Sequence, residues 1–144
     1  MKVVIISGYF NPLHMGHIYY IKAAKELGDH LVVIINNDIQ QRLKKGKIIM
    51  YEEERSYVVE AVGYVDEVIV AVDEDSSVTE TIKLIAEKYK DYKIIFANGG
   101  DRRSEEDIPE ARVCKEYNIE MKFAVGGEEK VNSSSDINKR LGLE

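Results

Sequence analysis

Disulfides, long apolar segments and an excess of positive charge are all missing from this sequence. Among its 144 residues there is one cysteine, Cys114, which cannot form an internal disulfide. No apolar run approaches the roughly 20 residues needed to cross a bilayer, and the amino terminus lacks the pattern of a secretory signal. We therefore expect a cytoplasmic protein without a membrane partner. Cys114 stands at helical spacing from Ile108 and Ala111, which favours a small core residue over a nucleophile.

Acidic residues outnumber basic ones, 26 against 20, which gives a net charge of −6 at pH 7. A general nucleic-acid binder is more often basic, so we expect no nucleic-acid partner. The length corresponds to about one domain, and no repeat, low-complexity tract or linker divides the chain. We predict a single domain over residues 1–144, in which local groups must hold any phosphate.

Two common phosphate-binding motifs, Walker A and GxGxxG, are also absent, as is the GxSxG elbow of acyl-transfer enzymes. Short apolar runs instead alternate with helical patterns along the whole chain, which is typical of a parallel sheet covered on both faces. This alternation predicts a three-layer α/β/α sandwich with a five-stranded parallel sheet. The expected strands are residues 2–7, 31–35, 67–72, 92–97 and 119–125.

The stretch Gly8–His17, GYFNPLHMGH, occupies the turn between the first expected strand and the first helix. Loops that leave the carboxyl ends of parallel strands face one crevice, and a helix that begins there offers free N–H groups to an anion. His14 and His17 are spaced to share one helix face, and Gly16 leaves room for a phosphate. A lone histidine such as His30 is better interpreted as structural, but this pair favours phosphate binding.

Three later segments are expected at the same edge of the sheet. The polar segment 40–47, predicted as a loop, brings Lys44 there, unless it is simply a solvated loop. The pair Gly99-Gly100 lets the backbone pass close to a flat base, although a plain turn is the alternative. Ser133–Ser135 exceed what one N-cap needs, so their spare hydroxyls suit a polyphosphate.

Together these groups favour nucleotidyl transfer. A phosphate oxygen of an acceptor would attack the α-phosphorus of a nucleoside triphosphate in line and expel pyrophosphate. His14 and His17 would stabilise the charge on the α-phosphate and the departing oxygen, and Lys44 would neutralise it. We expect Mg²⁺ as the cofactor, held mainly by phosphate and water, and therefore no metal ligand from the protein.

The HxGH sequence at His14–His17 resembles the signature of the cytidylyltransferase-like nucleotidyltransferases. The resemblance implies a Rossmann-like fold, a homodimer, CTP or ATP as donor, and a small phosphomonoester such as glycerol 3-phosphate or a sugar phosphate as acceptor. It and the reasoning above predict that the nucleotide contacts Gly8, Tyr9, Phe10, Gly16, Gly99, Gly100, Asp101, Ser133, Ser134 and Ser135. The predicted acceptor contacts are Asp38, Arg55, Asp66 and Arg102.

The chain departs from the family pattern at several places. Asn11 stands where an aspartate is common, and an arginine of the cytidylyltransferases is missing from Glu128–Ser134. Gly99-Gly100-Asp101 is similar to a turn of heptose-phosphate adenylyltransferases, whereas Asp38–Val68 looks most like glycerol-phosphate cytidylyltransferase, which places CTP slightly ahead of ATP. Arg102 and Arg103 either contact an anionic acceptor or form a solvated pair. The alternatives are a non-catalytic nucleotide-binding regulator and a nicotinamide- or pantetheine-phosphate adenylyltransferase.

Overall fold

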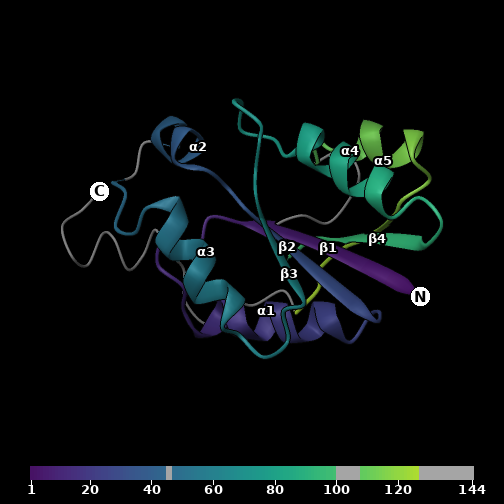
Figure 1. Cartoon of the computed structure of the whole chain (residues 1–144), viewed down its shortest axis with the longest axis horizontal. Helices are drawn as coiled ribbons and strands as arrows, with labels where there is room; N and C mark the ends of the chain where they lie inside the picture. The colour runs from purple at the N-terminus through teal and green to yellow at the C-terminus, as the bar shows by residue number, and fades with distance from the viewer. Residues whose placement is uncertain (45–46, 100–107, 127–144) are drawn as a thin grey trace.

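The computed structural model describes residues 1–44, 47–99 and 108–126, and in these ranges five strands and five helices alternate (Figure 1). The strands are β1 (Lys2–Gly8), β2 (His30–Ile35), β3 (Glu67–Val70), β4 (Lys93–Ala97) and β5 (Glu120–Lys122). The helices are α1 (Met15–Lys25), α2 (Asp38–Leu43), α3 (Glu52–Glu60), α4 (Thr79–Lys88) and α5 (Ala111–Glu116). Every strand pair is parallel, in the order β3-β2-β1-β4-β5.

Helices cover both faces of this sheet, with α1 and α3 on one side and α4 and α5 on the other (Figure 1). The central strands β1 and β2 are mainly apolar because each face of the sheet needs its own core. In β1, Val3 and Ile5 pack in the core that contains α4 and α5, whereas Val4 and Ile6 pack in the core under α1 and α3. The predicted three-layer sandwich with a five-stranded parallel sheet is confirmed.

The strand order reverses at the middle of the sheet, which is where the ligand crevice of open parallel sheets is expected. From β1 the chain continues outward to β2 and β3, and it later crosses back to β4 and β5 on the other side of β1. In open parallel sheets, ligands bind beyond the carboxyl ends of the strands where the order reverses in this way. The turns that follow Gly8 in β1 and Ala97 in β4 flank this position.

The segment that we predicted as a loop is in part the helix α2. Asn37 is its N-cap residue and accepts the backbone N–H of Gln40, while the side chain of Gln40 accepts the backbone N–H of Asn37. Both amides also donate to carbonyls of the chain that follows β3, including those of Ala71 and Ser77. This reciprocal cap, together with its buried partners, stabilises a helix that has few apolar residues.

Two other helices differ in detail from the sequence patterns. Ser77 and Glu80 have the spacing of a capping box, which predicts a cap at Ser77. This prediction is wrong: no side chain caps α4 at its N-cap residue, Val78, and the Asp73 carboxylate accepts the N–H groups of Glu80 and Thr81 instead. In α3, the fully buried residues are Arg55 and Val59, whereas the C-cap residue Ala61 is exposed.

The environment of the single cysteine is as expected. Cys114 lies on α5, is fully buried and packs in the core that contains α4 and α5. Within the described ranges, no helix has the length and apolar character needed to cross a membrane.

Candidate active site

The turn between β1 and α1 is closed by its own two histidines. His14 is the N-cap residue of α1, and its Nδ1 accepts the backbone N–H of Gly16 at 3.1 Å. In return, Nδ1 of His17 accepts the backbone N–H of His14 at 3.1 Å. The rings stack with their centroids 3.8 Å apart and their planes at 25°. The two imidazoles therefore satisfy N–H groups at the helix start and lie together on one face, as their spacing predicted.

These caps determine which nitrogen of each ring carries the proton. A ring nitrogen that accepts a hydrogen bond has no proton of its own, so each neutral imidazole is protonated on Nε2. Nε2 lies across the ring from the nitrogen that caps the backbone, and its N–H is a donor. The start of α1 adds the partial positive charge of a helix amino terminus. The turn thus offers two imidazole donors in a field that favours an anion.

The buried ring of Phe10 packs against the ring of His17. Its backbone has a φ of 52°, its ring is 1% exposed, and the ring centroid lies 4.8 Å from that of His17 in an edge-to-face arrangement. A Cβ on Gly8 would lie 2.8 Å from Cζ of Phe10, so only glycine leaves room for the ring. The contact of Phe10 with the nucleotide stays a prediction; in the structure its ring is buried and packs against His17.

Arg55 is buried behind the turn and does not line it. Its guanidinium is 0% exposed. It donates at 2.7–2.8 Å to three backbone carbonyls, those of Tyr9, Asn36 and Met50. It also donates to Oδ1 of Asp38 at 2.8 Å. We predicted Arg55 and Asp38 as acceptor contacts, but both side chains are bound within the protein. They join the loop after β1 to the loop after β2.

Asn11 has a structural role that the sequence did not reveal. Its amide is 1% exposed, donates to the carbonyl of Lys47 at 2.9 Å, and accepts the N–H groups of Ile49 and Met50 at 2.9 and 3.0 Å. A carboxylate at this position accepts but cannot donate. The amide therefore explains why asparagine suits this position: it ties the β1–α1 turn to the segment that precedes α3.

Lys44 reaches the same edge of the sheet from the end of α2. It is the C-cap residue of that helix, and its Nζ lies 4.5 Å from the centroid of the Tyr9 ring. Such a cation–π contact stabilises a lysine above an aromatic face. Tyr9 follows β1 directly, and the exits of β1 and β2 are joined by the N–H of Asn36, which donates to the carbonyl of Gly8 at 2.9 Å.

The turn after β4 approaches this edge from the other side of β1. A Cβ on Gly99 would lie 3.9 Å from the ring of Tyr20 on α1, which is an ordinary contact. The structure thus places the described candidates Gly8, Tyr9, Phe10, His14, Gly16, His17, Asp38, Lys44, Arg55 and Gly99 at or behind the carboxyl edge of the sheet. The predicted contacts Gly100, Asp101, Arg102, Ser133, Ser134 and Ser135 lie outside the described residues.

Asp66 lies at the opposite edge of the sheet. Its carboxylate accepts the N–H of Leu31, at the start of β2, and Nζ of Lys25 at 2.8 and 2.5 Å. Burial alone would raise the pKa of Asp66, but these two hydrogen bonds outweigh it and lower that pKa. We predicted Asp66 as an acceptor contact, but the structure does not bring it together with the histidine turn, because Asp66 precedes its strand instead of following it.

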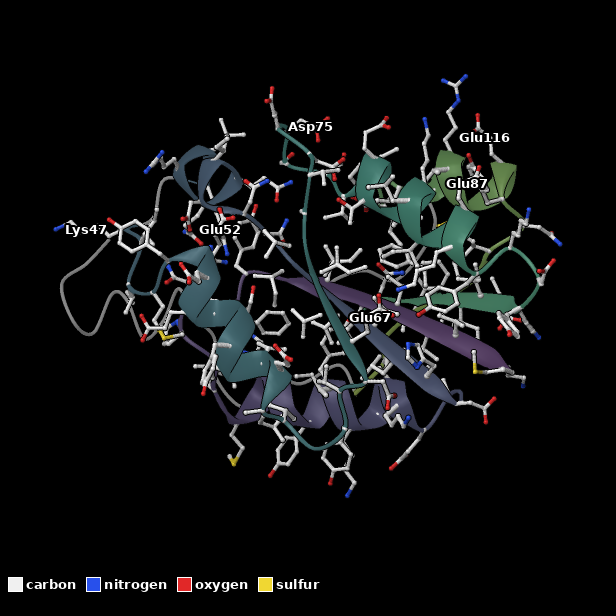
Figure 2. The ribbon with its side chains drawn as sticks, viewed as in Figure 1. Lys47, Glu52, Glu67, Asp75, Glu87 and Glu116 are labelled. Carbon is white, nitrogen blue, oxygen red and sulfur yellow. The ribbon has the colours of Figure 1, made fainter. Side chains whose placement is uncertain are left out.

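His30 is also at this edge, where the strands begin. We expected no functional group beside it, but it has two side-chain partners. Its Nε2 lies 3.1 Å from both Oε1 of Glu67 and the hydroxyl of Tyr89, and Lys88 bonds Glu67 as well. Burial alone would raise the pKa of Glu67, but bonds from Lys88, Tyr89 and His30 lower it to about 2. In Figure 2, Glu67 lies apart from Lys47 and Glu52, which are near the carboxyl edge. The group is structural, as we interpreted His30.

The comparisons with known proteins agree with this arrangement. The FAD synthase of Picrophilus torridus is 31% identical over 142 residues, which cover 96% of this chain and 94% of that protein. Ethanolamine-phosphate cytidylyltransferase of Arabidopsis thaliana is 38% identical over 114 residues, 75% of this chain and 26% of that one. Alignments with other archaeal FAD synthases, such as that of Pyrococcus abyssi at 44% identity, span about half the length of those relatives.

A solved structure has the same fold. The lipopolysaccharide core biosynthesis protein from Thermoplasma volcanium superimposes with a TM-score of 0.66 at 28% identity, over 85% of this chain and 93% of that one. The family model for cytidylyltransferase-like proteins matches residues 5–140. The match covers the β1–α1 turn, most of both cores and all the candidate site residues. The chain therefore belongs to the cytidylyltransferase-like family.

Proposed function

We propose that this chain is a nucleotidyltransferase, which moves a nucleoside monophosphate from a triphosphate to a phosphomonoester and releases pyrophosphate. The observation that carries the proposal is the reciprocal cap of His14 and His17, which fixes two Nε2–H donors in one turn at the crevice of the sheet. Chemistry at phosphorus needs such donors aimed at developing charge, and it needs no nucleophile from the protein.

In the proposed reaction, a phosphate oxygen of the acceptor attacks the α-phosphorus of the bound triphosphate. A bond forms between that oxygen and the phosphorus, and the bond to the oxygen that bridges the α- and β-phosphates breaks. The electron pair leaves with pyrophosphate. Nε2–H groups of His14 and His17 stabilise the charge that develops on the α-phosphate and on the departing oxygen, and no proton transfer through the rings is required.

Lys44 adds a positive charge on the same side, since its contact with Tyr9 keeps it near the end of β1. Among the described residues, no group of three or more His, Cys, Asp or Glu is arranged to hold a metal ion. The Mg²⁺ ion of the proposed reaction would therefore arrive on the triphosphate, held mainly by phosphate and water. Such an ion neutralises phosphate charge.

AMP transfer to a flavin phosphate is the first candidate within this class. Its support is the similarity to the FAD synthase of Picrophilus torridus over nearly the whole of both chains. FAD is FMN with an AMP group on its phosphate, so FMN is a phosphomonoester of the kind that the mechanism requires. ATP then supplies the nucleotide.

CMP transfer to a smaller phosphomonoester is the second candidate, and it is the one that the segment Asp38–Val68 favoured. Its support is the similarity to ethanolamine-phosphate cytidylyltransferase over 75% of this chain. Glycerol 3-phosphate, ethanolamine phosphate and a sugar phosphate are acceptors of this type. The predicted nucleotide contacts at the β4 turn and in the serine cluster belong to both candidates.

The test is a matrix of donors and acceptors followed by pyrophosphate release. ATP, CTP, GTP and UTP with Mg²⁺ are each paired with FMN, glycerol 3-phosphate, ethanolamine phosphate, a heptose phosphate, nicotinamide mononucleotide and phosphopantetheine. We expect pyrophosphate and the nucleotidylated acceptor in equal amounts from ATP with FMN. Turnover only with CTP selects the second candidate. Binding of a nucleotide without pyrophosphate from any pair supports the regulator instead.

The quaternary structure is a separate proposal. The resemblance to the family suggests a homodimer, and sedimentation of the full chain at several concentrations measures its mass directly. A single species with the 16.4 kDa mass of one chain at all concentrations would contradict it.

A further inference from the structure

Tyr20 connects α1 to the turn that follows β4. It lies three positions after His17 in α1, and its hydroxyl donates to the carbonyl of Ala97 at 2.6 Å. Ala97 is the last residue of β4 and is 1% exposed, so its carbonyl depends on partners within the protein. The Tyr20 ring also lies beside Gly99, where a Cβ would be 3.9 Å away. One side chain thus pins the point at which the chain leaves β4.

The backbone of the same residue supports the chain that leaves β5. Gly126 has a φ of +87°, and a Cβ there would lie 3.1 Å from Cα of Tyr20. Asn98 joins the two exits, because its N–H donates to the carbonyl of Lys122 and its carbonyl accepts the N–H of Val125, both at 2.9 Å. The exits of β4 and β5 are therefore fixed to each other and to α1 at Tyr20.

We infer that Tyr20 is a positioning residue for nucleotide binding, which sets the distance between the site of the phosphates and the site of the base. The inference rests on the proposed function, in which His14 and His17 meet the phosphates and the Gly99 turn passes the base. Both sites are attached to α1. His14 and His17 lie at the start of the helix, and Tyr20, one helical turn later, holds the turn that follows β4. Tyr20 itself touches no reacting atom.

The hydroxyl is the part of Tyr20 that matters for this role. In Tyr20→Phe the ring still fills its place, but the Ala97 carbonyl loses a donor and the turn gains freedom. That freedom is lost again when a nucleotide binds, which weakens binding. Inorganic tripolyphosphate, by contrast, occupies only the site of the phosphates, and its affinity does not depend on the Gly99 turn.

The experiment compares wild type, Tyr20→Phe and the matched variant Tyr19→Phe. Tyr19 is the neighbouring residue on α1 and is 50% exposed. Titration calorimetry with MgATP, MgCTP and Mg-tripolyphosphate gives the dissociation constants. We expect Tyr20→Phe to raise the dissociation constant of the nucleotide that wild type binds by about tenfold, and that of tripolyphosphate by less than twofold. Tyr19→Phe should change neither. In turnover, the KM for the nucleotide rises while the KM for the acceptor and kcat stay near wild type.

The outcomes separate this inference from the proposed function. If no donor and acceptor pair releases pyrophosphate, the proposed function fails, and the ratio of nucleotide to tripolyphosphate affinity still decides the role of Tyr20. Equal weakening of both ligands by Tyr20→Phe, or no weakening of either, overturns the inference. So does a wild-type protein that binds neither nucleotide. Urea unfolding of each variant verifies that the proteins compared are folded.

Discussion

His14 combines two properties that one substitution can separate. Asparagine is among the best N-cap residues, so His14→Asn keeps an acceptor for the N–H of Gly16. It removes the Nε2–H donor. We expect the free energy of unfolding to stay within about 0.5 kcal/mol of wild type, while kcat falls about 10²–10³-fold with the loss of one donor to the α-phosphate. Urea unfolding and steady-state kinetics measure the two effects.

His14→Ala is the matched variant, since it removes the cap and the donor together. It should lose about 1 kcal/mol of stability in addition to the activity. A His14→Asn enzyme that turns over at the wild-type rate would show that the ring is needed only for the helix.

The buried guanidinium of Arg55 should contribute strongly to stability. Arg55→Met leaves Asp38 without its ion pair, and it leaves the carbonyls of Tyr9 and Asn36 without this donor. Breaking a buried pair from one side costs about 3–5 kcal/mol, and we expect a loss of this size in urea unfolding. Arg42→Gln on the exposed side of α2 is the control, with an expected change below about 0.5 kcal/mol. Similar losses in both variants would contradict the role of Arg55.

The sequence predicted the residues of the histidine turn better than the buried residues that hold this turn in place. His14 and His17 carry a signal in their spacing, which puts both on one helix face. Arg55 carries none, because its partners are mainly backbone carbonyls that no side-chain motif encodes. The resemblance to the family predicted a contact with the acceptor instead. The burial of Arg55 became visible only once the loops after β1 and β2 were placed next to each other.

At the scale of elements, α2 shows where hydrophobic patterns fail. Its residues, DIQQRL, have too few apolar positions for a helical pattern, so a loop was the natural prediction. The signal that could have found it is Asn37 followed three positions later by Gln40, which is the spacing of a capping box. The same spacing occurs at Ser77 and Glu80, but there the carboxylate of Asp73, further away in the sequence, accepts the N–H groups of the helix.

The turn after β5 should tolerate no side chain at Gly126. Its φ of +87° is unfavourable for other residues, and a Cβ would lie 3.1 Å from Cα of Tyr20. We expect Gly126→Ala to reduce the free energy of unfolding by about 1–2 kcal/mol. Gly63→Ala is the control, because no atom lies within 4 Å of a Cβ there. Thermal unfolding of the two variants tests this, and equal stability would contradict the close packing of Gly126 on α1.

The hydrogen-bonded group at the amino ends of β2 and β3 should make stability depend on acid. The pKa of Glu67 is about 2 in the folded chain, against an ordinary value of 4.5. A depressed pKa stabilises the fold fully above about pH 4.5, and this contribution is lost as the pH falls toward 2. Relative to Glu67→Gln, wild type should gain about 1 kcal/mol near pH 6, because partly exposed networks are screened.

Urea unfolding at several pH values measures the difference between wild type and Glu67→Gln. It should shrink steadily below pH 4.5. A difference that is constant from pH 6 to pH 3 would mean that the carboxylate charge of Glu67 does not stabilise the fold.

At the scale of the whole molecule, the sheet was the most predictable feature. The inner strands are buried on both faces, and the runs Val3–Ile6 and Leu31–Ile35 carry that signal without reference to the rest of the chain. The distance of Asp66 from the histidine turn has a topological cause. A residue before a strand lies at the amino edge and one after it at the carboxyl edge, so its position in the sequence already excluded it from the crevice.

A ligand in this crevice should stabilise the whole fold, because it contacts turns that belong to several elements. At a free nucleotide concentration 100 times its dissociation constant, the gain is about 2.7 kcal/mol. For a chain of this length, that raises Tm by about 5–10 °C. Thermal unfolding with MgATP or MgCTP tests it, and the shift should shrink when EDTA removes the metal. No shift with any nucleoside triphosphate at millimolar concentration would contradict nucleotide binding in this crevice.

The rings of His14 and His17 each accept a backbone N–H group at the start of α1, so mutations at either position also affect the helix. This constrains how descendants of the chain can diverge. A single mutation that abolishes chemistry at His14 or His17 also loosens α1, unless the new residue is a good cap. Lineages that abandon the proposed reaction should therefore pass through asparagine, serine or aspartate at position 14, the N-cap, and a search among inactive homologues can look for that trace.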